Sequence, residues 1–292
     1  MEAIEGLKRA IHVTAELQTL VKTMKVLAGL NIRQYERAAH AVAEYNHTIE
    51  MGLRIALRRM PDPLPASPPD HARQLGAIVF GTDQGMCGQL NDIVAGHATR
   101  ALKRLAARHG EQTILAVGQR VASALEDHGR TVAAALNVPS SISGVGATIH
   151  ELLRRVEEWR LAGHTGMVVL FHCRLTSGVF YRPRGLLLLP VDPDWIRSLR
   201  VKKWPSRVLP ASFMESERLY RSLIREFLFV SLFRALTESL ASENAARLAS
   251  MQVAERNIDD RLKELTASFH HARQTAITSE LLDIISGFEA LK

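Results

Sequence analysis

The chain has 292 residues, of which 47% are hydrophobic and 23% charged, and its formal net charge is +7. This composition provides a core for one or two domains and excludes a disordered chain. The longest apolar runs are far shorter than the roughly 18 residues that span a membrane, and no secretory leader opens the sequence, so we expect a soluble, intracellular protein.

Residues 1–60 contain no proline, and their apolar residues follow a heptad repeat. Thirteen of the seventeen a and d positions are apolar, which predicts one helix of about 85 Å with a continuous seam. Polar Gln18, Lys25 and Asn46 on this seam lower its stability but help to set the register. The seam positions are Ile4, Leu7, Ile11, Thr14, Gln18, Val21, Lys25, Ala28, Ile32, Tyr35, Ala39, Val42, Asn46, Ile49, Leu53, Ala56 and Met60.

Residues 74–192 alternate between strand and helix patterns, which is typical of an α/β domain. This order predicts a mostly parallel sheet with an antiparallel hairpin at one edge. The expected elements are a strand at 77–81, a helix that Asn91 caps and Gly110 ends, a strand at 113–118, a helix at 121–128, a strand at 131–137, a helix at 146–161, and strands at 167–174 and 179–190 around Thr176-Ser177-Gly178.

Residues 211–292 follow the last proline and predict a second long helix, of more than about 110 Å. Ser212 and Glu215 have the spacing of a capping box at its start. Apolar residues repeat at spacings of four and three from Ile258 to Ala276, and the stripe then shifts by one residue to Ile277. Between Leu219 and Leu240 the helix is apolar on more than one face, so we expect more than one partner to cover it.

These three zones predict a Rossmann-like α/β domain inserted between long N- and C-terminal helices that form an antiparallel coiled coil. Either helix alone would gain little stability, so each should pack on the other. The C-terminal helix is longer by about twenty residues, so one of its ends should extend past the partner helix.

The glycine-containing loop Gly81–Asn91 is the most enzyme-like stretch of the sequence. It lacks the Gly-Lys-Ser/Thr of a P-loop and the glycine spacing of a dinucleotide site, so we interpret it as a tight strand-to-helix turn. Cys87 lies near a helix N-terminus, which favours a lower thiol pKa, but the sequence places no histidine beside it.

The two cysteines, Cys87 and Cys173, are too few for a disulfide framework and lack the close spacing of a zinc site. We expect reduced, buried thiols, and neither a metal nor a cofactor. A basic run from Arg197 to Arg207, between Trp195 and Trp204, has the composition to face nucleic acid or acidic lipid. We interpret it as a solvated loop. No combination of side chains predicts a catalytic site.

Four stretches together resemble the gamma subunit of F-type ATP synthases. They occur in the family's order along the whole chain. Val21–Ala28 is similar to its Thr-Lys-Ala-Met segment, Thr82–Asn91 to Thr-Asp-Arg-Gly-Leu-Cys-Gly-Gly-Leu-Asn, Leu240–Met251 to Ser-Glu-x-Ala-Ala-Arg-Met, and Ala272–Leu281 to Ala-Arg-Gln-x-x-Ile-Thr-x-Glu-Leu.

The chain also departs from the family pattern. Gln84 and Gln89 replace an arginine and a glycine of the middle motif, and the acidic stretch that often follows the family's tryptophan is missing after Trp204. Such divergence is similar to that of the alternate, sodium-translocating F-type ATPases of bacteria.

The resemblance implies a non-catalytic central-stalk rotor subunit that couples proton or sodium flow to ATP synthesis or hydrolysis. Its implied partners are the alpha and beta subunits of the catalytic ring, the epsilon subunit and the membrane c-subunit ring, with no nucleic acid and no small-molecule substrate. The implied location is the cytoplasmic face of the bacterial inner membrane, as a peripheral protein. Residues whose family counterparts suggest partner contacts are Lys22, Met24, Glu243, Arg247, Gln274 and Thr278.

The resemblance also gives a reason for an apolar band that is wider than a two-helix seam needs. This band consists of Leu17, Leu20, Met24, Leu27 and Leu30. Inside a ring of surrounding subunits, such side chains would have partners on the outward face of the helix.

Two other classes of function remain open at this point. The pI of 9.7 is compatible with a coiled-coil protein that binds nucleic acid, in which case binding would weaken steeply with salt. The α/β domain is compatible with an enzyme, in which case the domain alone would bind a nucleotide.

Overall fold

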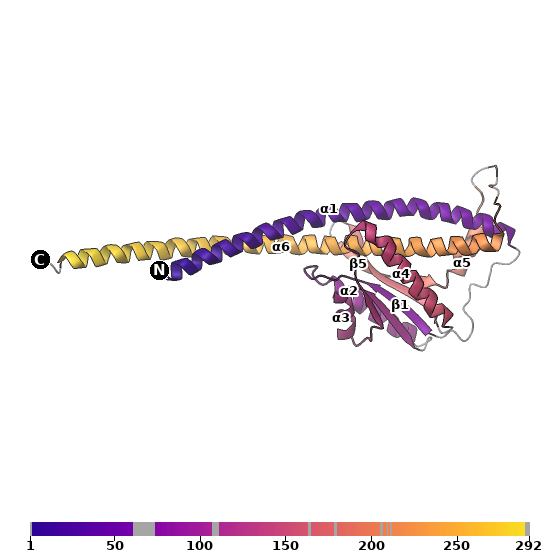
Figure 1. The fold of residues 1–292 in the computed structure, drawn as a ribbon, viewed down its shortest axis with the longest axis horizontal. Helices are drawn as coiled ribbons and strands as arrows, with labels where there is room; N and C mark the ends of the chain where they lie inside the picture. Colours follow the sequence, from indigo (N-terminus) through magenta and orange to yellow (C-terminus); the bar gives the residue numbers. More distant parts are fainter. Residues whose placement is uncertain are drawn as a thin grey trace. The chain divides into compact units, whose positions relative to one another are not determined.

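The computed structural model describes residues 2–60, 74–106, 111–162, 165–177, 180–204, 207–208, 210 and 212–289. Their elements, shown in Figure 1, are the helices α1 (Glu2–Arg59), α2 (Leu90–Ala106), α3 (Gln119–Asp127), α4 (Ile142–Leu161), α5 (Pro193–Val201) and α6 (Ser216–Glu289), and the strands β1 (Gln74–Phe80), β2 (Gln112–Val117), β3 (Ala134–Leu136), β4 (Thr165–Ser177) and β5 (Phe180–Leu189). The proline cluster at 61–69, Gly110, Gly178 and Leu291 lie outside the described residues.

The chain divides into two compact units, and both long helices contribute to each of them. One unit combines residues 1–29 with residues 247–292, and the other comprises residues 30–246. The first unit is therefore a pair of helical segments, whereas the second contains the whole sheet. We describe the two units separately.

The sheet of the second unit has the order β3-β2-β1-β4-β5. β1 pairs in parallel with both β2 and β4, β2 pairs in parallel with β3, and β4 pairs antiparallel with β5. This confirms the predicted mostly parallel sheet with an antiparallel hairpin at its edge. β1 lies at the centre, and six of its seven residues are buried, as expected for a strand covered on both faces.

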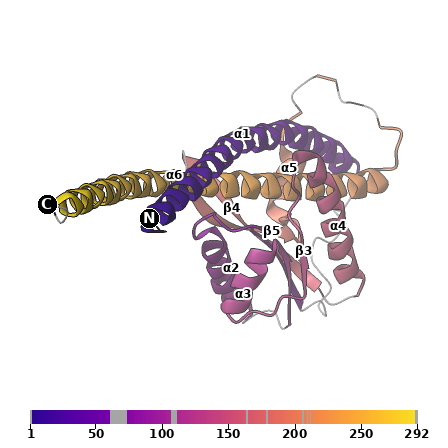
Figure 2. The same ribbon diagram turned by 60° about the vertical axis from the view of Figure 1, so that its left-hand side comes forward.

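Helices cover both faces of this sheet, as Figure 2 shows. Leu75, Ala77 and Val79 of β1 pack with α2 and α3 in one buried cluster. The alternate residues Ile78 and Phe80 pack with α4 and α6 in a second cluster. The two-residue period of the strand therefore distributes its side chains between two cores.

The predicted seam of α1 is confirmed along its whole length. All seventeen of its positions are buried or half-buried, and five of the seven hydrophobic positions from Tyr35 to Met60 are at most 8% exposed. On α6, the stripe from Ile258 to Ala276 is likewise buried or half-buried. In the second unit, residues between Leu219 and Leu240 join two separate clusters, which confirms that several elements cover this part of α6.

Three local predictions need correction. The last long helix begins at Ser216 and not at Ser212, because the Ser212 hydroxyl accepts a hydrogen bond from the Met214 amide (3.2 Å) in a turn before the helix. Asn91 lies inside α2, and its side chain binds Thr82 instead of capping the helix. The expected solvated loop contains a helix, α5, whose start is stabilised by Asp192 accepting from the Asp194 amide and by Pro193 in its first turn.

Gly118, which precedes α3, gives a direct test of how closely the loops above the sheet pack. Its φ is +121°, and an added Cβ would lie 2.7 Å from the backbone N and O of Thr82. We expect Gly118→Ala to lower the free energy of unfolding by about 3 kcal/mol, through both the clash and the strained backbone. Urea denaturation of the full chain measures this change.

Gly146→Ala is the matched control, because Gly146 lies in α4 and an added Cβ there meets nothing within 4 Å. This substitution should raise stability by about 0.5–1 kcal/mol through helix propensity. Equal effects of the two substitutions would contradict the close packing of Gly118.

Candidate functional site

The paired helices of the first unit meet through polar as well as apolar seam residues. Lys25 Nζ donates to Glu255 Oε2 at 2.5 Å, and Gln18 Nε2 donates to Asp259 Oδ1. The earlier residue on α1, Gln18, pairs with the later residue on α6, Asp259, so the two segments run antiparallel. Each of these polar pairs can form in only one alignment of the two helices. The contacts therefore fix the register, as the polar residues on the seam predicted.

The outward faces of the same helices carry large apolar side chains that the seam does not cover. Each of the following side chains is 48–60% exposed: Val13, Leu17, Leu20, Val26 and Leu27 on α1, and Ile277, Leu281, Leu282, Ile284 and Ile285 on α6. A concentration of exposed large apolar side chains is typical of an interaction site. The predicted wide band on α1 is thus present, with Met24 half-buried beside it.

The end of α6 extends past the start of α1 in this unit, as Figure 1 shows at the ends marked C and N. This confirms the predicted overhang and locates it at the C-terminal end of the helix. From Ile277 to Ser286, every described side chain is exposed. The overhang therefore presents apolar side chains on several sides of a single helix.

The six residues expected to contact partners do not form one cluster. Lys22, Gln274 and Thr278 are exposed, and Met24 and Arg247 are half-buried. Gln274 lies nineteen residues beyond Glu255 along α6, a helical distance of about 28 Å, so the positions form separate levels along the helix pair. Glu243 is 7% exposed, so it packs largely within the chain.

The segment of α6 that contains Glu243 is buried on every side. All seven residues from Leu240 to Ala246 are buried. Leu240 and Ala241 pack in the cluster that includes Tyr35 of α1, whereas Ala246 packs in the cluster of α2 and the opposite face of the sheet. Small side chains in this motif let α1 and the α/β domain approach the helix together, which explains the motif as a packing signature.

A charged group joins the sheet to α6 in the same unit. His172 of β4 is 2% exposed, and its Nε2 lies 3.0 Å from Glu238 Oε2. Arg234 Nε and Arg174 Nε lie 3.0 and 3.5 Å from the other oxygen of Glu238. Burial alone raises the pKa of the Glu238 carboxyl, but the hydrogen bonds from His172 and Arg234 and the nearby cationic charge outweigh burial and lower it.

The loop Gly81–Asn91 is a structural clamp, as its interpretation as a tight turn predicted. Asn91 Oδ1 accepts from the Thr82 amide at 3.1 Å, and Asn91 Nδ2 donates to Thr82 Oγ1 at 2.9 Å. Asp83 accepts from the amides of Gln119 and Val138 at 2.9 and 2.7 Å. These bonds tie β1 to α2, α3 and the chain after β3, so they use the polar groups that a nucleotide phosphate would need.

Both cysteines are free and buried, as predicted. Cys87 is 2% exposed and lies 3.6 Å from Thr82 Oγ1. Burial raises the pKa of the Cys173 thiol to about 12. Neither thiol therefore has the access that a nucleophile requires.

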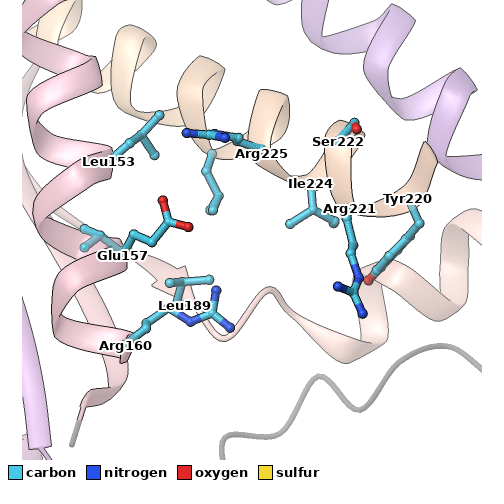
Figure 3. A pocket seen from close by; sticks show the side chains of 11 residues that line it. Leu153, Glu157, Arg160, Leu189, Tyr220, Arg221, Ser222, Ile224 and Arg225 are labelled. Carbon is cyan, nitrogen blue, oxygen red and sulfur yellow. The ribbon is translucent and has the colours of Figure 1, made fainter. Parts of the chain in front are cut away.

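A groove of about 620 Å³ lies between α4 and α6 (Figure 3). Glu157 and Arg160 of α4 face Arg221 and Arg225 of α6 across an apolar floor that includes Leu228. Arg221 is paired with Glu217. Among its described lining residues there is no histidine, cysteine or carboxylate pair for nucleophilic or acid–base chemistry, and their composition is that of a binding surface.

No group of three or more His, Cys, Asp or Glu side chains in the described ranges is placed to hold a metal ion. No described helix is both long and apolar enough to cross a membrane.

The structure thus combines an α/β domain with long helices that pair antiparallel in the first unit and carry exposed apolar side chains. A family model described as ATP synthase matches residues 3–291. The curated relatives include ATP synthase gamma chains of Anaeromyxobacter sp. (strain Fw109-5), 28% identical, and Rhizobium johnstonii, 26% identical, each over 100% of both chains. The chain belongs to this ATP synthase family, and the relatives that it matches along its whole length are gamma chains.

Solved structures agree on the fold. A chain of the Euglena gracilis mitochondrial ATP synthase (OSCP/F1/c-ring, rotational state 3) is 18% identical, with a TM-score of 0.63 over 99% of this chain and 95% of that one. A chain from the rotor of the same enzyme gives a TM-score of 0.59 at 17% identity, over 94% of this chain and 99% of that one.

The contact between His172 and Glu238 predicts a pH-dependent contribution to stability. We expect Glu238→Gln to lower the free energy of unfolding by about 2 kcal/mol at pH 7, because a neutral amide is a weaker partner for the surrounding cations. The folded-state pKa of Glu238 is lowered, so this stabilisation is complete above the unfolded-state pKa and is lost as the pH falls through the folded-state value. Urea denaturation should show a larger deficit at pH 7 than at pH 3.

Glu264→Gln serves as the control, because Glu264 forms an ion pair with Arg261 in which both side chains are more than 60% exposed. This exposed pair should contribute little at either pH. A deficit for Glu238→Gln that is the same at pH 7 and pH 3 would rule out the charge of Glu238 as its cause.

Proposed function

We propose that this chain couples ion flow through a membrane ring of c subunits to ATP synthesis or hydrolysis by turning inside a ring of alpha and beta subunits. The epsilon subunit would bind the α/β domain. The chain itself performs no chemistry, and it works as a peripheral protein on the cytoplasmic face of the bacterial inner membrane. ATP chemistry takes place on its partners.

The observation that carries the proposal is the outward apolar surface of the paired helices in the first unit. The seam between α1 and α6 already satisfies the side chains that face inward, yet ten large apolar side chains remain 48–60% exposed on the outward faces. Such a surface is unfavourable in water and suits a sleeve of surrounding protein. A shaft that turns within a ring needs apolar side chains on its outward faces, whereas a free-standing coiled coil does not.

The polar residues on the same helices suit contacts that must form and break. Lys22, Gln274 and Thr278 are exposed at separate levels of the pair. A rotating shaft needs contacts that differ with angle, and single hydrogen bonds of about 1 kcal/mol are weak enough to exchange between neighbouring subunits. We assign these three residues, with Met24 and Arg247, to contacts with the surrounding ring.

Nucleic-acid binding receives less support from the described residues. Ten of the exposed apolar side chains lie on the paired helices, whereas a nucleic-acid interface is strongly basic and polar. On α1, Lys22 and Lys25 are close in sequence, but Lys25 is paired with Glu255. The seam therefore neutralises charge that a phosphate backbone would need.

Gln274→Ala tests the proposed ring contact. Gln274 is exposed, so its truncation creates no cavity and should leave the unfolding midpoint of the chain unchanged. Loss of one hydrogen bond should lower ATP-driven ion pumping by the reassembled complex roughly fivefold. The measurement is pumping per ATP hydrolysed, together with thermal unfolding of the isolated chain.

Gln252→Ala is the matched control, since Gln252 is an exposed glutamine on the same helix and in the same unit, just outside the family-like stretches. Pumping should be unaffected by it. If both substitutions reduce pumping equally, or if Gln274→Ala unfolds the chain, Gln274 has no specific role in contacting the ring.

A further inference from the structure

Three segments that are distant in sequence share one surface of the second unit. The Arg58 guanidinium donates to the backbone oxygen of Lys202 at 3.4 Å, and the Arg59 guanidinium donates to that of Ser212 at 3.3 Å. Behind these bonds, apolar residues of all three segments pack in one buried cluster that includes Leu57, Met60, Ile196, Leu199 and Tyr220. The end of α1, the helix α5 and the start of α6 are therefore held together.

This surface carries a concentration of positive charge, most of which is not paired with a carboxylate among the described residues. Between Pro193 and Met214 the sequence has five Lys or Arg residues and a single carboxylate, Asp194, which pairs with Arg197 at 2.6 Å. We call the following exposed residues the cationic patch: Arg58, Arg59, Lys202, Lys203 and Arg207. Among the residues that the structure describes, none of these five forms an ion pair with a carboxylate. Such a patch attracts an anionic partner.

Apolar side chains protrude beside the cationic patch. Val201 is 83% exposed, Val208 is 77% exposed and Phe213 is 104% exposed. Cations next to fully exposed aromatic and aliphatic side chains are the composition of a surface that enters the headgroup region of a membrane. A loop that only faces solvent would not be expected to expose a phenylalanine, because an apolar side chain is unfavourable in water.

We propose that the cationic patch binds the surface of an anionic phospholipid bilayer, with Phe213 and the two valines entering the headgroup layer. The patch is spread over three segments, which suits the distributed charge of a lipid surface, whereas an acidic protein loop would need charges at matching positions. Each cation near such a surface strengthens binding roughly fivefold. This inference is separate from the rotor function and holds whether or not the chain turns.

The test is binding of the full-length chain to vesicles, measured by co-sedimentation at about 0.1 M salt. Vesicles that contain phosphatidylglycerol in phosphatidylcholine should bind the wild-type chain, and pure phosphatidylcholine vesicles should not. Lys202→Gln with Lys203→Gln should weaken binding roughly 20-fold, and Phe213→Ser should weaken it severalfold. Free inorganic phosphate at constant ionic strength should not compete.

The matched control is Arg33→Gln with Arg37→Gln, which removes two exposed cations from α1 in the same unit. This control should bind as the wild type does. Thermal unfolding at an unchanged temperature establishes that each variant is folded.

Three results would overturn the proposal. Equal weakening by the two double substitutions would mean that net charge, and not the patch, causes binding. Competition by inorganic phosphate would indicate a discrete anion site. Absence of binding to phosphatidylglycerol vesicles would leave an acidic protein surface as the partner of the patch.

Discussion

The burial of one stretch of α6 on all sides is the constraint on which the structure depends. Residues 240–246 pack against α1 and also against the cores on both faces of the sheet. The same helix continues into the first unit without a break. The side chains of residues 240–246 are locked in two cores, so this stretch of the helix cannot turn against the sheet without disrupting both.

Polar contacts add orientation to this packing. His172 and Glu238 place a charge-assisted hydrogen bond between β4 and α6, and Lys25 with Glu255 places another in the helix seam. Apolar side chains tolerate small displacements along a helix, whereas a buried carboxylate leaves its partners unsatisfied when it moves. Apolar packing alone would permit several positions of each helix along and around its axis. The polar pairs therefore select one of these positions. A transmitter of torque needs this selection.

Periodicity was sufficient to predict the large elements of the fold. The heptad of residues 4–60 and the strand–helix alternation of residues 74–192 predicted helices and strands within a few residues of their observed ends, because burial on one face or two leaves a regular apolar pattern. Local competition between hydrogen bonds was harder to predict. Asn91 has the side chain of a helix cap, but Thr82, nine residues away, supplies a closer partner. Similarly, α5 was hidden within a basic run because its buried residues, Ile196 and Leu199, are few.

The functional surface was only partly visible in the sequence. The motif around Glu243 is similar to that of the family, but similarity does not distinguish packing from contact, and the structure buries this side chain. His172 could have been noticed as a polar residue within the apolar run of β4, although its partner, Glu238, lies sixty-six residues away. Asp83 gave no signal, since two backbone amides from other loops bind it. Such partners depend on tertiary structure.

The most direct test of the account is whether the paired helices of the first unit turn as one body. Ala28 is a fully buried seam residue of α1, and a disulfide from this position to the facing residue of α6 would prevent the helices from sliding past each other, provided the Cα separation permits unstrained geometry. Single-molecule observation of the assembled complex should then show ATP-driven rotation at the same rate before and after reduction. Rotation that stops in the oxidised state and resumes on reduction would contradict the account, because it would mean that the helices must separate or slide in each turn.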